Sequence, residues 1–543
     1  MGDAGGGRLT RDARDAPDAG RSPCRGAPDL TDDGARAARK AMVTGVLSTG
    51  YEPNGEKAVG LLTDLYELTM AEGYWRGGLR DMETCFVSFF RENPFDGGFA
   101  LVCGTGQIAE LIEKFRYTDE DIAYLRGLTA PGGGPLLSGE FLDWLADWRP
   151  RLAIDAIREG DLAFPREPVV RVMGPVIDCQ LIEAPLLNLV NFQTLVATKT
   201  ARVCIAADGR GVAEFGLRRA QGADGSLSVA RASYVGGCSS TSNVLAGERF
   251  GIPVSGTHAH AWVMAFPDEL AAFRAYAEVS PRNCTLLVDT YDVIQGVRNA
   301  ITVGKEMEGR GERLAGIRID SGDLASLSRT ARSMLDDAGL SYVKIVLSND
   351  LDENLIESLL AQGAQVDAFG VGTKLATCAP QPFLSGVYKM SAKRMPGQQW
   401  QPVMKVSEQV YKRTIPGVQD LRRYRDASGR PIADMICERD FPTDVPARMI
   451  DPLDVMLTRD LPATGGERVL APVVRDGAAV EGAWDGIEAS RARARESLAS
   501  LDPACRRFLN PPVYPVGIEQ SLSDLRQAMI ARVRGASRTP SWR

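Results

Sequence analysis

The sequence contains very little histidine: two copies in 543 residues, His258 and His260. Its ten cysteines form no C-x-x-C pair, so no zinc site or redox cofactor is expected, and the chain suits a reducing cytoplasm. No apolar run is long and pure enough to span a bilayer. No compact apolar segment marks a secretory signal at the N-terminus. We therefore expect a cytoplasmic protein with no membrane partner.

The chain also lacks a surplus of positive charge. Its net charge of -7 argues against a broad nucleic-acid-binding surface, although it allows a local basic pocket. Hydrophobic residues make up 44% of the chain and charged residues 24%, which is the balance of a globular protein in water. The length predicts several domains.

Composition divides the chain into four regions. Residues 1–55 are rich in Gly, Ala, Arg and Asp and lack aliphatic periodicity, so they are predicted to be a disordered extension. Their many Asp residues disfavour a transit peptide. Residues 56–200 are predicted to form an N-terminal α/β domain and residues 201–390 a catalytic domain. Residues 391–543 are predicted to form a C-terminal domain that packs on both.

The N-terminal region begins with a predicted helix that Thr63 caps and Gly77 ends. A strand is expected at 83–91, helical structure over 106–150, and a long apolar helix from 183 to about 202. After residue 390 the composition turns to Pro, Arg and Asp, which predicts short strands. Two further helices are expected near the C-terminus, at 486–501 and 519–534.

Strands and helices alternate in the catalytic region. Buried strands are predicted at 285–289, 316–320, 343–348 and 366–371, each of the first three followed by a helix. This alternation implies parallel strands with right-handed crossovers. Both a doubly wound sheet and a (β/α) barrel satisfy it.

Each of these strands ends in a segment of polar or glycine residues. These segments are Asp289, Asp320–Asp323, Ser348–Asp350 and Gly370–Thr373. Ligand sites of both parallel architectures lie at the carboxyl ends of the strands. Asp, Ser and Asn also cap helices, which explains any one strand end alone. Four consecutive ends favour a shared site.

Arg318 and Asp320 form the most informative pair. Because side chains alternate along a strand, the two lie on the same side. A cation beside an acid can hold an anionic group and a hydroxyl-rich or metal-bound group together. The alternative interpretation is a buried structural ion pair.

Two further segments can bind anions. Gly370-Val-Gly372-Thr373 lets bare backbone N–H groups and one hydroxyl approach a phosphate, and a tight turn explains it equally well. Arg218 stands beside Arg219 in a glycine-rich loop, and its planar guanidinium fits a phosphate or carboxylate. An ordinary surface arginine pair is the alternative.

The histidines stand at i and i+2, after a Gly-Thr dipeptide. In an extended segment they would point the same way, and in a helix they would diverge. A zinc site needs three or four ligands, so this pair alone does not form one. A neutral imidazole is a competent nucleophile near pH 7, which makes one of the two a candidate catalytic group.

The order of seven segments closely resembles the nicotinate phosphoribosyltransferase family: LLTDLYELTMAEGYW, FFRENPFDGGFALVCG, GLRRAQG, SSTSNVLAG, GTHAH, GIRIDSGDL and GVGT. The similarity runs from about Leu61 to about Met390, with a weaker echo in RFLNPPVYPV near the C-terminus. The resemblance implies an α/β fold: an irregular (β/α) barrel of the type II phosphoribosyltransferase kind, with an α/β domain formed from N- and C-terminal segments.

The resemblance also implies an activity. Members join nicotinate to 5-phosphoribosyl 1-diphosphate, giving nicotinate mononucleotide and diphosphate, with Mg²⁺ as cofactor and ATP as co-substrate. ATP phosphorylates a histidine, which here corresponds to His260, whereas His258 falls on a variable position. A homodimer is implied, with the active site at the subunit boundary.

The family pattern assigns further residues by position. Tyr66, Thr257 and Arg318 correspond to nicotinate-binding positions. Asp320 corresponds to a catalytic acid near the ribose, and Asp320 or Asp289 is expected to hold Mg²⁺.

The phosphate-binding positions implied by the resemblance are Arg218, Gly370, Gly372 and Thr373. Ala261 departs from the family pattern, because members often carry serine there. Two alternatives stay open: a phosphoribosyltransferase for nicotinamide or quinolinate, and a catalytically silent relative that only binds ligands.

Overall fold

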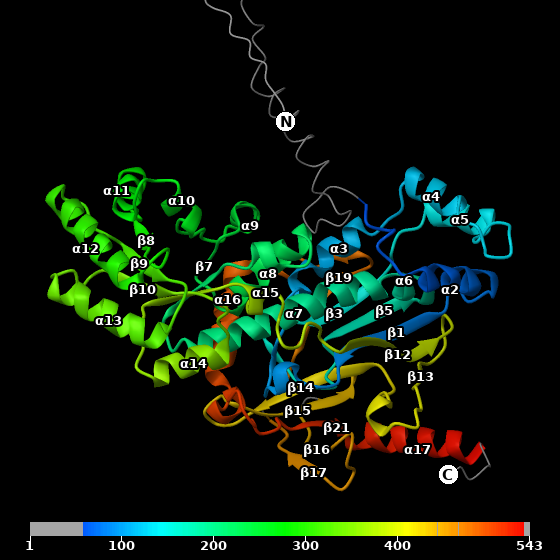
Figure 1. Cartoon of the computed structure of the whole chain (residues 1–543). Helices are drawn as coiled ribbons and strands as arrows, with labels where there is room; N and C mark the ends of the chain where they lie inside the picture. The colour runs from blue at the N-terminus through cyan, green and yellow to red at the C-terminus, as the bar shows by residue number, and fades with distance from the viewer. Residues whose placement is uncertain (1–57, 443, 465, 537–543) are drawn as a thin grey trace, which may run out of the picture. The chain divides into compact units, whose positions relative to one another are not determined.

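The computed structural model describes residues 58–442, 444–464 and 466–536 (Figure 1). The predicted extension 1–55 therefore lies outside the described residues. In the described part, the strands form three large sheets and one two-stranded ribbon. None of its helices has both the length and the apolar content needed to cross a membrane.

The catalytic region forms an all-parallel sheet. Its strands are β6 (Gly211–Glu214), β7 (Ser240–Thr241), β8 (Thr285–Leu287), β9 (Gly316–Ile319), β10 (Lys344–Leu347) and β11 (Ala368–Val371). They pair in the order β7-β6-β11-β10-β9-β8. Because the last strand, β11, pairs with the first, β6, the order follows a ring that is open between β7 and β8 among the described residues. The sheet is thus an irregular, incomplete barrel, as predicted.

Helices connect these strands: α8 (Ala223–Gly236), α9 (Val244–Phe250), α10 (His260–Met264), α11 (Glu269–Val279), α12 (Val293–Gly309), α13 (Leu324–Asp337), α14 (Glu353–Ala361) and α15 (Thr373–Ala376). Asp292, Asp323 and Asp352 cap α12, α13 and α14 by accepting a backbone N–H in the first turn. The acids that come earlier after the strands, Asp289 and Asp320, do not cap. The strand ends therefore carry two sets of acids with different roles.

The N-terminal region forms an antiparallel sheet that strands from further along the chain complete. The strands are β1 (Glu83–Phe90), β3 (Ala153–Ile157), β5 (Val170–Pro175), β12 (Gly386–Arg394), β13 (Gln401–Pro402), β19 (Leu470–Arg475) and β20 (Ala478–Ala479). Their order is β13-β12-β1-β5-β3-β19-β20. This confirms that N- and C-terminal segments share one α/β domain. The predicted boundary after residue 390 falls inside β12, and the domain boundaries stay predictions.

The helices of this region are α2 (Leu65–Arg76), α3 (Ile108–Lys114), α4 (Asp119–Arg126), α5 (Gly139–Ala146), α6 (Val176–Leu181) and α7 (Glu183–Ala206). The predicted capping role of Thr63 is wrong: Asp64 is the N-cap, and the Thr63 hydroxyl instead lies within hydrogen-bond distance of the Glu67 carboxylate and the Leu181 carbonyl. Residues 106–150 form three short helices because Thr118 and Ser138 each start a new one.

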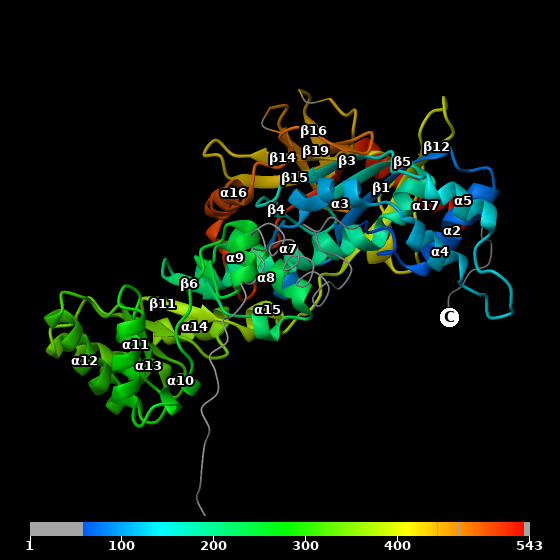
Figure 2. The same cartoon turned by 90° about the horizontal axis from the view of Figure 1, so that it is seen from above.

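The C-terminal region forms the third sheet (Figure 2). Its strands pair in the order β17-β16-β21-β15-β14-β18: β14 (Gln419–Arg425), β15 (Pro431–Glu438), β16 (Ala447–Ile450), β17 (Thr458–Leu461), β18 (Gly466–Arg468) and β21 (Val516–Glu519). The two predicted helices are present as α16 (Ile487–Ser500) and α17 (Gln520–Ala536). The ribbon consists of β2 (Ala100–Leu101) and β4 (Leu162–Ala163).

Helix α7 connects the parallel sheet with the antiparallel sheet, since it contacts β6, α8 and α14 as well as β2 and β12. Two buried cations on α7 meet one buried carboxylate on α14. Lys199 Nζ lies 2.5 Å and Arg202 Nε 2.8 Å from the Glu353 carboxylate, and all three side chains are almost fully buried. Removing the acid would leave two unpaired charges in the interior.

Replacing Glu353 by glutamine is expected to lower the free energy of unfolding by about 3–5 kcal/mol. Urea denaturation followed by circular dichroism measures the change. The matched control is Glu357→Gln on the exposed face of the same helix, with an expected change below about 0.5 kcal/mol. Equal unfolding free energies for the two variants would contradict this role of Glu353.

Candidate active site

Arg318 lies near the carboxyl end of β9 and joins three segments of the chain. Its Nη2 lies 3.0 Å from Asp320 Oδ1, as the alternation of side chains predicts. Its Nε donates to Ser348 Oγ at 2.7 Å, and its Nη1 donates to Thr257 Oγ1 at 3.0 Å. The polar residues after β9 and β10 therefore share one site, and Thr257 joins them from the segment before α10.

A second carboxylate lies beside this cluster. Asp289 Oδ2 accepts the backbone N–H of Asp320 at 3.0 Å and the hydroxyl of Ser321 at 2.6 Å. Its other oxygen, Oδ1, is buried and has no hydrogen-bond partner among the described residues. An acceptor oxygen in that state suits a cation or a donor group of a bound molecule.

This donor set fits Mg²⁺. The described residues contain no cluster of three or more His, Cys, Asp or Glu side chains able to hold a metal by themselves. Mg²⁺ usually takes one or two carboxylates and completes its shell with water and substrate phosphates. Asp289, with its unpartnered oxygen, and Asp320 can supply those carboxylates.

The two histidines have different environments. His258 is buried: its Nε2 accepts the backbone N–H of Leu287 at 3.1 Å, and its ring packs against Tyr276 with centroids 4.7 Å apart. Burial, followed by the nearby charge of Arg318, lowers the pKa of His258. Its contacts are those of a structural residue.

His260 is the first residue of α10 and is only partly buried. Its Nδ1 lies 3.1 Å from Thr290 Oγ1. Thr290 directly follows Asp289, so His260 is placed next to the acidic side of the cluster. In the tautomer whose Nδ1–H donates to Thr290, Nε2 keeps its lone pair. This nitrogen can then act as a nucleophile.

The glycines of the GVGT turn lie against Phe215. A Cβ on Gly370 would lie 2.6 Å from the Phe215 ring, and a Cβ on Gly372 would lie 2.9 Å from its carbonyl oxygen. The same ring lies 5.9 Å from the Arg318 guanidinium carbon. Both glycines are therefore required by packing that sets an aromatic face beside Arg318. Phosphate binding by Thr373 and these glycines stays a prediction.

Arg218 lies in the short 3-10 helix η3 (Leu217–Arg219) and is exposed. The turn before it packs on the GVGT turn, because a Cβ on Gly216 would lie 3.2 Å from the Gly372 carbonyl oxygen. No ion pair or hydrogen bond of the Arg218 side chain is found within the described residues. The structure thus brings Arg218 next to the predicted phosphate loop and leaves its guanidinium available.

Tyr66 is not brought to this cluster. It is partly exposed on α2, which packs on α6, and no contact joins it to Arg318 in the described part of one chain. Desolvation, followed by the charge of Glu183, raises the pKa of its phenol. One copy of the chain therefore holds its predicted nicotinate-binding residues in two places.

Three residues of the site were not predicted from the sequence. Ser348 was noted at a strand end, but its bridge between Arg318 and Asp320 was not foreseen. In the sequence, the only indication that Thr290 belongs to the site was its position next to Asp289. For Phe215 there was none, because an aromatic residue after a short strand is usually core.

Three family models match the chain. They are the nicotinate phosphoribosyltransferase (NAPRTase) N-terminal domain over residues 61–191, the nicotinate phosphoribosyltransferase (NAPRTase) family over 211–426, and the nicotinate phosphoribosyltransferase C-terminal domain over 419–526. Together they span nearly all the described residues. The order of the matches agrees with the order of the motifs.

Named relatives show the same similarity. The nicotinate phosphoribosyltransferase of Bacillus subtilis is 45% identical over 67% of this chain and 72% of its own. The Homo sapiens nicotinate phosphoribosyltransferase is 34% identical over 87% of this chain and 96% of its own.

The crystal structure of human nicotinic acid phosphoribosyltransferase matches with a TM-score of 0.73 and 32% identity, over 86% of this chain and 99% of that one. The fold predicted for the type II phosphoribosyltransferases is therefore confirmed. Fold, motif order and whole-length similarity agree, and the chain belongs to the nicotinate phosphoribosyltransferase family.

Proposed function

We propose that the protein transfers the phosphoribosyl group of 5-phosphoribosyl 1-diphosphate to nicotinate, forming nicotinate mononucleotide and diphosphate for NAD biosynthesis. The observation that carries this is the Arg318 cluster, which sets a cation, two acids and an aromatic face at one end of the barrel. The names of the relatives give the reaction, and the cluster contains groups suited to each part of it.

Arg318 supplies the recognition of the acid. The Arg318 side chain is 15% exposed, so a carboxylate can pair with its guanidinium. The pyridine ring would then lie beside Phe215. The amide of nicotinamide carries no charge and would turn its N–H donors toward those of the guanidinium, so nicotinate is favoured over nicotinamide. This preference argues against the nicotinamide alternative. Quinolinate has a second carboxylate, for which the Arg318 cluster offers no second cation.

The acids serve the sugar. As the bond from C1 to diphosphate breaks, C1 gains positive charge, and Asp320 is the acid proposed to stabilise it. The pyridine nitrogen is already a nucleophile, so no strong base is required. Asp289 and Asp320 would hold Mg²⁺, which when bound neutralises charge on the diphosphate. Arg218 and Thr373, in adjacent turns, are proposed to bind phosphate.

We propose that His260 Nε2 attacks the γ-phosphorus of ATP: an N–P bond forms, the bond to the bridging oxygen breaks, and ADP leaves. Hydrolysis of the phosphohistidine would then drive the transfer forward. The contact with Thr290 supports this role, because it engages Nδ1 and leaves Nε2 open. A silent relative would not need a partly exposed imidazole beside two acids.

We further propose a homodimer in the cytoplasm. Tyr66 lacks a contact with Arg318 within the described part of one chain, and its aromatic ring is partly exposed. A second copy that contributes Tyr66 would give the pyridine ring a second aromatic face opposite Phe215. Analytical ultracentrifugation tests the dimer directly.

Incubation with γ-labelled ATP is expected to give an acid-labile, base-stable label that His260→Ala abolishes. Thr290→Val is expected to slow labelling about 10-fold, since one hydrogen bond orients the ring. His258→Ala serves as the control, because it removes a structural contact and leaves the nucleophile. Persistence of the label in His260→Ala, or its loss only in His258→Ala, would refute the assignment.

Arg318→Gln is expected to lower kcat/KM for nicotinate on the order of 100-fold, and to lower it much less for nicotinamide. Steady-state assays with both substrates measure the ratio. Arg310→Gln, at an exposed arginine after α12, should leave both values unchanged. Equal losses for the acid and the amide would show that Arg318 does not read the carboxylate.

A further inference from the structure

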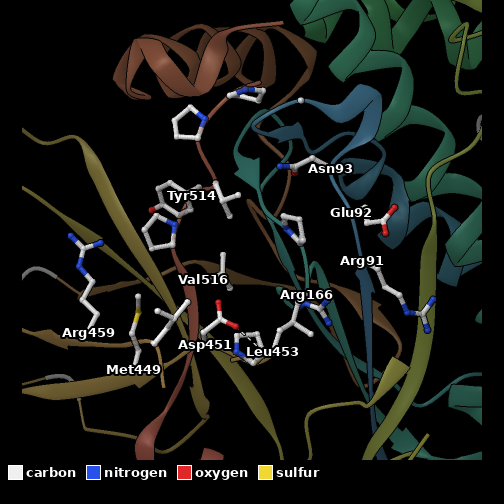
Figure 3. Close-up of a pocket in the computed structure, with 18 of the residues that line it drawn as sticks. Arg91, Glu92, Asn93, Arg166, Met449, Asp451, Leu453, Arg459, Tyr514 and Val516 are labelled. Carbon is white, nitrogen blue, oxygen red and sulfur yellow. Dashed lines mark hydrogen bonds between the residues drawn. The ribbon is translucent and has the colours of Figure 1, made fainter. Parts of the chain in front are cut away.

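A cavity of about 910 Å³ lies on the C-terminal sheet, outside the Arg318 cluster (Figure 3). Its walls come from the segment after β1, the turn after β4, the loop between β16 and β17, and the proline-rich segment before β21. Much of the lining is apolar, including Met449, Leu453, Leu457, Val513 and Tyr514. A pocket of this size with a few polar groups is typical of a small-molecule site.

Arg166 supplies a cation to this cavity. It has a φ of 77°, a left-handed conformation that costs energy for any residue with a Cβ. Its Nη1 donates to the Tyr411 carbonyl at 3.3 Å. No ion pair of Arg166 is present among the described residues. The turn thus places an arginine without an ion-pair partner at a backbone position that glycine would occupy with less strain.

A second arginine lies behind it. Arg526 is 3% exposed and donates only to the carbonyls of Thr414 and Pro452, at 3.2 and 3.0 Å. Arg231 and Arg423 are buried to a similar degree, and each pairs with a carboxylate. In the described part of the chain, Arg526 has no such partner.

The positive charges of Arg166 and Arg526 lie close enough to affect each other. Burial, followed by the charges of Arg166 and Arg413, lowers the pKa of Arg526 to about 10. These three arginines line a small adjoining pocket, which shares Arg166 and Pro452 with the large cavity. Positive charge therefore accumulates at one wall of the large cavity.

Three acids, Glu92, Asp96 and Asp451, also line the cavity, and none of them forms an ion pair with Arg166 among the described residues. Asp451 Oδ1 accepts the backbone N–H groups of Leu453 and Asp454, at 2.7 and 2.9 Å, so one carboxylate oxygen shapes the loop. Asn93 extends toward the cavity in Figure 3, and its Oδ1 is buried with no hydrogen-bond partner in the described residues. The cavity thus combines charged side chains and the Asn93 amide with an apolar wall.

We propose that this cavity binds a small organic anion: a phosphate or carboxylate that pairs with Arg166 and carries an apolar or ring-shaped body along the proline-rich wall. The Arg318 cluster contributes no residue to the cavity, so this binding is independent of the proposed reaction. A small anion such as inorganic phosphate would pair with Arg166 but would leave the apolar wall in contact with water.

The probe is 8-anilinonaphthalene-1-sulfonate, an aromatic anion whose fluorescence rises in apolar sites. The full chain is expected to bind it at one saturable site. Arg166→Gly is expected to weaken this binding at least 10-fold while keeping the melting temperature at or above that of the wild type, because glycine suits the backbone conformation. Adenosine monophosphate and octanoate, as competitors, distinguish a phosphate ligand from a carboxylate ligand.

The matched control is Arg448→Gln, an exposed arginine that neighbours Met449 on β16, and Arg318→Gln reports on the proposed active site. Both should bind the probe as the wild type does. Unchanged binding in Arg166→Gly would overturn the proposal. So would equal displacement by inorganic phosphate, or binding that declines as the protein concentration rises, since a second copy would then cover the cavity.

Discussion

The guanidinium of Arg318 is the interaction on which the site depends. Its fork of donors contacts Asp320 directly after β9, Ser348 directly after β10, and Thr257 in the segment between β7 and β8. That segment lies where the ring of strands is open. Because backbone pairing does not close the ring there, side chains make the connection, and His258 adds a second one to Leu287. The site thus lies where strands β7 and β8 do not pair.

Much of the fold follows from the order of residue types. The alternation of buried strands with helices predicted the parallel sheet, and the alternation of side chains along a strand placed Arg318 and Asp320 together. Alternation could not choose between a doubly wound sheet and a barrel, because that depends on β11 pairing with β6 across more than 150 residues of chain. The prediction that Thr63 caps the helix was wrong because its hydroxyl hydrogen-bonds with Glu67 instead. That contact depends on tertiary packing.

The site was predictable in its charges and less so in its shape. The two histidines show why: Ala259 is extended and α10 begins at His260, so one ring turns inward and the other stays partly exposed. A change of backbone between two neighbouring residues leaves no periodic signal. Phe215 was missed for a related reason, since its role depends on Gly370 and Gly372 from a distant strand. The residues next to Phe215 in the sequence give no indication of that contact.

The substitution at Ala261 has a physical consequence for the proposed phosphorylation. A nucleophilic imidazole needs its second nitrogen engaged, so that the reacting nitrogen keeps a lone pair and the ring keeps its orientation. A serine at position 261, as the resemblance implies, would supply a hydroxyl from the same helix. Here Thr290 provides one from the segment after β8, next to the acid with an unpartnered oxygen. The orientation of His260 thus depends on Thr290, whose neighbour in the chain, Asp289, carries a carboxylate oxygen without a partner among the described residues.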